Sequence, residues 1–254
     1  MADKHLEVDL SSKTAIVTGG SRGIGKAIAL ALAGAGANVV VAARTEDDAA
    51  SLPGTIHRTV EEVGALGGKA LAVRCDVTDT GDVDAMVAAA TSAFGAVDIL
   101  VNNAGLLHGP TFGDTDPEDA ERLLRVNVLG PFLCTRAVLP QMAGHKTGSI
   151  VNISSGLAQS THPGNNVYSA SKAALDRMML KLASEVAGDN IAVNLVYPGM
   201  IRSEGIVSRV PREMADGLPA PSVVGPPVVW LAAQDASSFT GRIVQVSSFG
   251  TEWP

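Results

Sequence analysis

At 254 residues, the chain has the length of one α/β domain and is short for two domains of about 150 residues each. Apolar residues make up 46% of it and charged residues only 18%, a balance that excludes an intrinsically disordered protein. The formal net charge of -7 removes the basic footprint of a nucleic-acid-binding protein and disfavours a polybasic membrane anchor.

Apolar runs that predict β-strands alternate along the chain with longer segments that predict helices. The expected strands cover residues 14–18, 38–43, 69–76, 97–102, 149–154, 191–197 and 241–247. The expected helices cover residues 24–35, 55–66, 79–94, 116–142, 166–187 and 228–233. Pro131 predicts a kink or a break in the fourth of these helices, and Thr78 or Thr80 is expected to cap the third.

Strands that alternate with helices favour parallel pairing through right-handed crossovers. The strands are continuously apolar, which is typical of a sheet covered on both faces. The chain shows no interdomain linker and no internal repeat. We therefore predict one α/β domain over residues 1–254, a Rossmann-type doubly wound parallel sheet of about seven strands with helices on both faces.

Three features indicate a cytoplasmic protein without a membrane span. Residues 1–12 are polar and charged, unlike a signal peptide. The most apolar stretch, residues 27–43, is interrupted by Asn38, so a helix followed by a strand explains it better than a span of about 20 residues. The two cysteines, Cys75 and Cys134, are too few for a disulfide framework and fit a reducing compartment.

A glycine-rich turn, Thr18-Gly19-Gly20-Ser21-Arg22-Gly23-Ile24-Gly25, joins the first strand to the first helix. Glycines let the backbone approach a pyrophosphate closely, and the helix N-terminus supplies unpaired N–H groups and a positive dipole end. Turn chemistry alone would also explain a single cluster of glycines. The spacing differs from the usual G-x-G-x-x-G pattern, since the recurring glycines are Gly19, Gly23 and Gly25.

This spacing resembles the TGxxxGxG signature of the classical short-chain dehydrogenases/reductases. Asn102-Asn103-Ala104-Gly105 is similar to the NNAG motif of that family, and residues 198–203 are similar to its P-G-x-[IV]-x-T turn, with Ser203 in place of threonine. Four further residues match the catalytic tetrad of the family in type and order: Asn127, Ser155, Tyr168 and Lys172. The resemblance extends from about residue 10 to residue 249.

The resemblance implies hydride transfer between nicotinamide C4 and a carbonyl or secondary alcohol, with Tyr168 as general acid/base. Tyr168 and Lys172 are four residues apart, so they share one face of a helix, and the positive charges of Lys172 and an oxidised nicotinamide favour a lowered tyrosine pKa. Ser155 would stabilise the substrate oxygen; it is preferred to Ser154 because it lies thirteen positions before Tyr168, the spacing of the family. Asn127 would hold a water that links Lys172 to solvent.

The resemblance also implies the residues that bind the cofactor. They are Gly19, Ser21, Arg22, Gly23, Ile24, Gly25, Arg44, Thr45, Asp76, Val77, Asn103, Ala104, Gly105, Tyr168, Lys172, Pro198, Gly199, Ile201 and Ser203.

The end of the second strand favours NADP(H) over NAD(H). Ala43 offers no carboxylate for the ribose hydroxyls, whereas Arg44 and Arg22 offer guanidinium groups for a 2′-phosphate. The alternative is that an acid of the segment 46–48 (Glu46, Asp47 or Asp48) reaches back to the ribose, but these residues lie two or more positions late.

The expected partners are a small carbonyl or alcohol substrate and further copies of the chain. The helix over 166–187 carries more apolar residues than one inward stripe needs, which predicts a homotetramer, with a dimer as the alternative. Residues 199–220 are expected to form a substrate lid; their apolar residues favour either a substrate with apolar bulk or an ordinary amphipathic helix. His108 and His162 either reach the substrate or belong to plain loops, and the five histidines lack metal-ligand spacing, so no metal is expected.

Two other functions are compatible with the same motifs. A regulatory NADP-binding protein can share the fold without catalysis. A reductase of enoyl or acyl-thioester substrates is the other alternative.

Overall fold

The computed structural model describes residues 8–48, 53–107, 109–207 and 210–254. Seven strands form one sheet in the order β3-β2-β1-β4-β5-β6-β7, and all neighbouring pairs are parallel. They are β1 (Thr14–Thr18), β2 (Asn38–Ala43), β3 (Lys69–Arg74), β4 (Ile99–Asn102), β5 (Gly148–Ile153), β6 (Ile191–Tyr197) and β7 (Ile243–Gln245). The expected seven-stranded parallel sheet is therefore confirmed.

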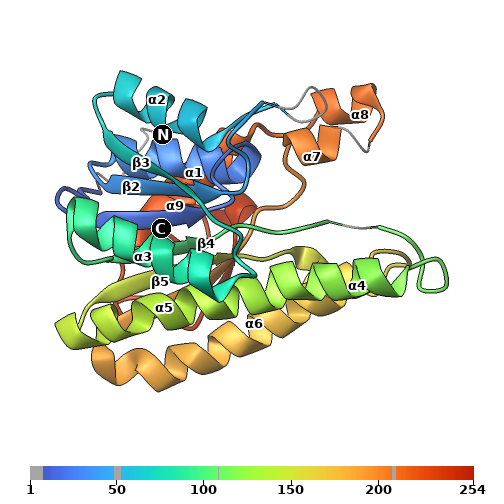
Figure 1. Cartoon of the computed structure of the whole chain (residues 1–254). Coiled ribbons are helices and arrows are strands. Elements are labelled where there is room, and N and C mark those ends of the chain that lie inside the picture. Colours follow the sequence, from blue (N-terminus) through green and yellow to red (C-terminus); the bar gives the residue numbers. More distant parts are fainter. Residues whose placement is uncertain (1–7, 49–52, 108, 208–209) are drawn as a thin grey trace.

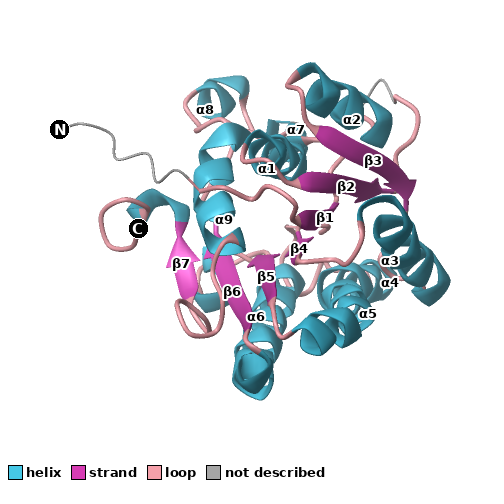
Figure 2. Ribbon diagram, turned by 90° about the vertical axis from the view of Figure 1, so that its left-hand side faces the viewer, coloured by secondary structure: helices cyan, strands magenta, loops and turns pink. Residues whose placement is uncertain are grey.

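Helices cover both faces of this sheet, as expected, and Figures 1 and 2 show the two layers. One layer contains α1 (Gly23–Gly34), α2 (Ile56–Ala65) and α9 (Gly225–Ala232). The other contains α3 (Thr80–Phe94), α5 (Gly130–His145) and α6 (Asn166–Val186). The remaining helices are α4 (Pro117–Leu124), which leads into α5, and the short α7 (Glu204–Val207) and α8 (Arg212–Asp216), which follow β6.

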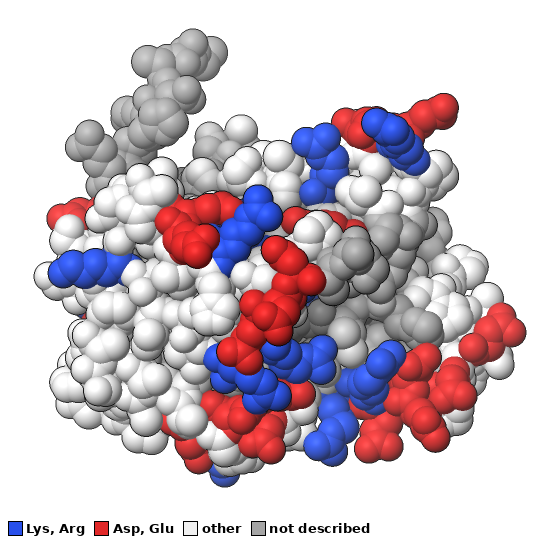
Figure 3. Space-filling model, turned by 45° about the horizontal axis from the view of Figure 1, so that its top comes forward, with Lys and Arg blue, Asp and Glu red and all other residues white. Residues whose placement is uncertain are grey.

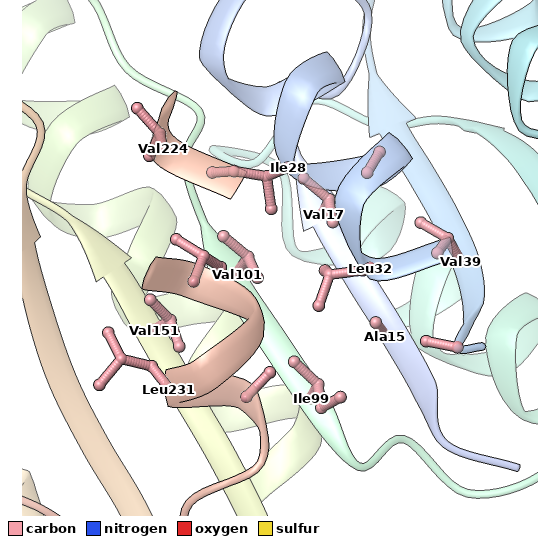
Figure 4. Close-up of a cluster of buried hydrophobic side chains, with 14 of the residues drawn as sticks. Ala15, Val17, Ile28, Leu32, Val39, Ile99, Val101, Val151, Val224 and Leu231 are labelled. Carbon is pink, nitrogen blue, oxygen red and sulfur yellow. The ribbon is translucent and has the colours of Figure 1, made fainter. Parts of the chain in front are cut away.

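The core consists of two apolar clusters, one on each face of the sheet. Successive strand residues point to opposite faces, so Ala15 and Val17 belong to one cluster and Ile16 to the other. Figure 4 shows the first cluster, in which Ile28 of α1 and Leu231 of α9 lie over the strands. This double coverage explains why the strands are continuously apolar.

Pro131 does not break its helix, so of the two outcomes expected from the sequence, a kink or a break, the break is wrong. A π-helical segment, η1 (Arg125–Leu129), joins α4 to α5, and Pro131 lies in the first turn of α5. Proline cannot donate an intrahelical hydrogen bond, and the wider π-helical turn shifts the hydrogen-bond register just ahead of it.

Several element ends also differ from the prediction. The third strand ends at Arg74, the fourth begins at Ile99 and the seventh is confined to Ile243–Gln245. Neither Thr78 nor Thr80 caps α3, because the Asp79 carboxylate accepts the hydrogen bond from the Asp82 amide at 2.9 Å.

The continuous helical run over Pro117–His145 is long and apolar enough to span a membrane by length and composition alone. Half of its most apolar window is buried inside the protein, and α5 packs against α3, β4 and β5. A core helix accounts for these features.

On the face shown in Figure 3, basic and acidic side chains are interspersed over the surface.

Candidate active site

The strand order reverses between β1 and β4. Open α/β sheets bind ligands in the crevice outside the carboxyl ends of the strands at such a reversal. The Asn103 side-chain amide donates to the main-chain oxygens of Thr18 and Gly19, at 2.9 and 3.2 Å. The amides of Asn103 and Ala104 donate to the Thr18 hydroxyl at 3.0 and 3.1 Å. These bonds join the Asn102–Gly105 segment to the glycine-rich turn.

The start of α1 lies at the glycine-rich turn and has no side-chain cap. Gly19 and Gly23 have φ of +67° and +55°, which side-chain-bearing residues rarely adopt. A Cβ on Gly25 would lie 2.3 Å from the Gly19 oxygen. No side chain caps α1 through the residue before it, Arg22, and its first turn carries no acidic residue. The residues present therefore fit a pyrophosphate at this helix N-terminus.

Two arginines, Arg22 and Arg44, lie near the end of β2 and contact different partners. The Arg22 guanidinium donates to the Thr45 hydroxyl at 2.9 Å and to the Gly54 oxygen at 3.2 Å, while Arg44 pairs with Asp76 at 3.6 Å. The acidic residues that follow have other contacts. The Glu46 carboxylate lies 3.8 Å from both His57 and Arg74, and Asp48 accepts from the Gly54 amide at 2.7 Å.

A cavity of about 300 Å³ lies between the ends of β2 and β3 and the α4–η1 segment. Arg44, Asp76, Thr78 and Val126 line it, together with four charged residues of α4 and η1: Glu118, Glu121, Arg122 and Arg125. The Asp76 carboxylate also accepts from the amide and hydroxyl of Thr78, at 3.0 and 2.8 Å, which fixes the Asp76-Val77 turn. Sequence reasoning missed the α4 residues, because nothing in the local pattern connects α4 to β3.

Three residues of the expected tetrad come together beside this crevice. Tyr168 and Lys172 lie on α6, with the Lys172 ammonium 5.8 Å from the centre of the tyrosine ring. The Tyr168 hydroxyl is hydrogen-bonded to Ser155, which follows β5. Lys172 donates to the Ile153 oxygen at the end of β5, at 2.8 Å. Ser155 rather than Ser154 is therefore the serine beside the tyrosine.

The fourth residue, Asn127, lies on η1. Its amide nitrogen donates to the Leu106 oxygen at 2.9 Å and to the Ser171 hydroxyl at 3.0 Å, and its oxygen accepts from the Leu106 amide at 2.8 Å. A Cβ on Gly105 would lie 3.3 Å from the Asn127 oxygen and 3.7 Å from the Lys172 ammonium. A glycine at this position thus lets Asn127 and Lys172 face the same point of the loop.

Burial dominates the ionisation of the site. It raises the pKa of Tyr168, and the hydrogen bond with Ser155 opposes that change. It lowers the pKa of Lys172 to about 8, and the negative charge of Asp176 opposes that change. The direction for Tyr168 differs from the lowered pKa expected from the sequence, because burial of the tyrosinate is the largest effect in the protein alone. The positive charge of an oxidised nicotinamide, when bound, would lower the pKa of Tyr168.

The turn after β6 lies against the start of α1. Gly199 has φ of +76°, and Ile201 is buried. A Cβ on Gly23 would lie 3.2 Å from both the Ser203 Cβ and the Glu204 carboxylate. This contact brings the expected Pro198–Ser203 segment to the glycine-rich turn.

The expected lid contains α7 and α8, which project from the molecule in Figure 1. His162 is exposed in the loop before α6. His108 lies outside the described residues.

The sequence model of the family described as short chain dehydrogenase matches residues 13–213. The chain belongs to this family. It is 38% identical to an uncharacterised oxidoreductase of Methylorubrum extorquens, over 94% of this chain and 97% of that protein. It is 36% identical to an Arabidopsis thaliana protein named NADPH-dependent aldehyde reductase-like, over 94% of each chain.

Among solved structures, a 7α-hydroxysteroid dehydrogenase in complex with NADH and 7-oxo glycochenodeoxycholic acid superposes with a TM-score of 0.87 and 32% identity, over 98% of both chains. The family resemblance expected from the sequence is thus confirmed. As a member of the short-chain dehydrogenases, the protein is an oxidoreductase that acts on CH–OH groups with a nicotinamide cofactor.

Proposed function

We propose that the protein is an NADP(H)-dependent carbonyl reductase or secondary-alcohol dehydrogenase, with Tyr168 as general acid/base. The observation that supports this most directly is the arrangement of Ser155 and Tyr168 with the buried Lys172 at the carboxyl end of the sheet. The uncapped N-terminus of α1 at the glycine-rich turn suits the cofactor pyrophosphate.

When bound, the reduced nicotinamide supplies the hydride that adds to the carbonyl carbon. As the electrons of the C=O double bond move to oxygen, the Tyr168 hydroxyl gives that oxygen its proton, and the product is the alcohol. The Ser155 hydroxyl donates a hydrogen bond to the same oxygen, and the Lys172 ammonium stabilises the tyrosinate. Water held by Asn127 then passes a proton from solvent to the Tyr168 oxyanion through Lys172. The raised pKa of Tyr168 keeps its hydroxyl protonated at neutral pH, as an acid in carbonyl reduction must be.

The experiment that tests this function is NADPH oxidation against a panel of aldehydes, ketosteroids, 3-oxoacyl thioesters and enoyl thioesters. Turnover of a carbonyl compound is the expected result. NADPH binding without turnover of any compound would instead support a regulatory NADP-binding protein. Turnover confined to enoyl thioesters would make the protein a reductase of that class.

We expect NADPH to bind at least about tenfold more tightly than NADH, or about 1.4 kcal/mol. Arg44 would exchange its ion pair with Asp76 for one with the 2′-phosphate. Arg22, which donates to the neighbouring Thr45 hydroxyl, would supply the second positive charge. Arg44→Asp should then shrink or reverse the ratio, measured by nucleotide fluorescence titration. The matched control is Arg242→Asp, an exposed arginine before β7 at the opposite end of the parallel sheet. Equal wild-type affinities for the two nucleotides would contradict the assignment.

We propose that residues 199–220 close over a substrate with apolar bulk. Met200, Val207 and Met214 are each roughly half exposed in this segment, at 48%, 47% and 46%. These three exposed apolar side chains in one segment suit contact with apolar parts of a substrate. The hydroxysteroid dehydrogenase in the similar structure holds 7-oxo glycochenodeoxycholic acid, a substrate class that this proposal places in the test panel.

We also propose a homotetramer assembled through the face formed by α4, η1, α5 and α6. Leu124 and Phe132 are 42% and 45% exposed there, and together with Ala174 and Met178 they line an apolar groove. Light scattering should return the mass of four 25.9-kDa chains, and Phe132→Glu should reduce it. Leu66→Glu, at an exposed leucine after α2 in the other helical layer, is the matched control and should leave the mass unchanged. A monomer mass at micromolar concentration would rule out this assembly. A dimer mass would support the alternative of a homodimer.

We propose a cytoplasmic location, since Cys75 and Cys134 are both free and buried.

A further inference from the structure

Asp176 is a buried carboxylate that no motif singles out. It lies on α6 one turn after Lys172, and only 6% of its surface is exposed. One carboxylate oxygen accepts from the Ser154 hydroxyl and the other from the Tyr197 hydroxyl, each at 2.5 Å. Both donors are themselves buried, at 2% and 6% exposure. Removing a carboxylate from water costs free energy even when both of its oxygens accept hydrogen bonds, and an opposite charge nearby offsets that cost.

The two donors connect Asp176 to the ends of two strands that border the active site. Ser154 directly precedes Ser155, and its amide donates to the Val196 oxygen of β6 at 2.9 Å. Tyr197 directly precedes the Pro198-Gly199 turn. Asp176 therefore connects α6, the end of β5 and the end of β6 at one point.

Asp176 follows Lys172 by four residues on α6, so the two buried side chains share one face of the helix, and the negative charge of Asp176 opposes the lowering of the Lys172 pKa. Lys172 is 5% exposed, and burial and Asp176 are the two influences on its pKa among the described residues. Around Lys172, α6 contributes Tyr168 and Asp176, β5 contributes the Ile153 oxygen, and η1 contributes the uncharged Asn127. Around Asp176, the end of β5 contributes Ser154 and β6 contributes Tyr197. Asp176 is thus the counter-charge of the lysine in this buried network.

We propose that Asp176 is a positioning residue that keeps Lys172 in its charged form and ties the ends of β5 and β6 to α6. This inference rests on the proposed function, in which Lys172 helps to bind the cofactor and its ammonium stabilises the Tyr168 oxyanion. Burial raises the pKa of Asp176, while its two hydroxyl donors and Lys172 favour the carboxylate. Loss of the carboxylate charge would leave burial unopposed at Lys172.

The test measures the NADPH dissociation constant of the full-length protein between pH 6 and pH 10 by nucleotide fluorescence. The pKa of Lys172 is lowered to about 8, so wild-type affinity should fall as pH rises through that region and the ammonium is lost. Asp176→Asn keeps the shape and the hydrogen-bonding capacity, because a hydroxyl partner can turn from donor to acceptor, but it removes the charge. The midpoint of the affinity loss should move at least about one pH unit lower. A parallel NADH titration removes any contribution of the 2′-phosphate, which titrates near pH 6.

Three further variants make the result decisive. Asp176→Ser removes the same charge with a smaller side chain that leaves room for water, and it should give the same shift if Asp176→Asn does not fold. Tyr197→Phe removes one hydrogen bond from Asp176 and keeps the carboxyl group, so it should lower thermal stability and move the midpoint clearly less than Asp176→Asn does. Glu185→Gln, at an exposed acid on the same helix, is the control for charge and should move neither.

The outcomes separate this inference from the function on which it rests. An unmoved midpoint in folded Asp176→Asn or Asp176→Ser would overturn the inference and leave the proposed function standing. An equal shift in Tyr197→Phe would reduce Asp176 to a structural role and would overturn it as well. Absence of NADPH and NADH binding in the wild type would overturn both.

Discussion

Replacing Tyr168 by phenylalanine is expected to lower the turnover of a good carbonyl substrate by at least about 1,000-fold, within the range of general acid catalysis. The substitution removes the hydroxyl that gives its proton to the substrate oxygen and keeps the ring beside Lys172. The NADPH dissociation constant should stay nearly unchanged, because the Lys172 ammonium and the glycine-rich turn are intact. The measurement is single-turnover NADPH oxidation combined with nucleotide fluorescence titration.

Ser155→Ala supplies the comparison for this result. It should lower turnover by about 100-fold or more through lost stabilisation of charge on the substrate oxygen. It removes the hydrogen bond that opposes the raised pKa of Tyr168, but it leaves the acid in place. Near-wild-type turnover by Tyr168→Phe would show that the tyrosine is not the acid/base and that the proposed chemistry is wrong.

Gly25→Ala is expected to weaken NADPH binding at least about 100-fold, or about 2.7 kcal/mol. The new Cβ would lie 2.3 Å from the Gly19 oxygen and 2.4 Å from the Asn103 amide nitrogen, so the glycine-rich turn and the Asn102–Gly105 segment must move apart. The start of α1 would then lose its position in the crevice. Nucleotide fluorescence titration measures the affinity, and thermal unfolding shows whether the fold persists.

Gly34→Ala is the matched control, because Gly34 lies at the other end of α1. A Cβ there would meet nothing within 4 Å. Alanine also favours the helix over glycine, so the unfolding midpoint should stay equal or rise while NADPH affinity is unchanged. Wild-type affinity in Gly25→Ala would mean that the turn does not bind the dinucleotide in the way proposed.

The sequence alone determined the architecture of this protein and predicted the central residues of its candidate site. The alternation of apolar strands and helices predicted the parallel sheet, because a strand buried on both faces carries a continuous apolar run over five or six residues. Tyr168 and Lys172 could be placed on one helix face because the i, i+4 relation is local. The glycine-rich turn could be placed at the start of α1 because strand, turn and helix are consecutive.

The tertiary structure decided what depends on contacts between distant segments. Neither the π-helical segment that carries Asn127 nor the contact of Glu204 with Gly23 follows from the local pattern. The sequence shows that Asp176 follows Lys172 by four residues, but it does not show the partners of Asp176. These are Ser154 and Tyr197, which are 22 and 21 residues away along the chain. Periodicity shows which side of an element is buried, whereas these pairings require the packing of α6 against β5 and β6, which no single segment encodes.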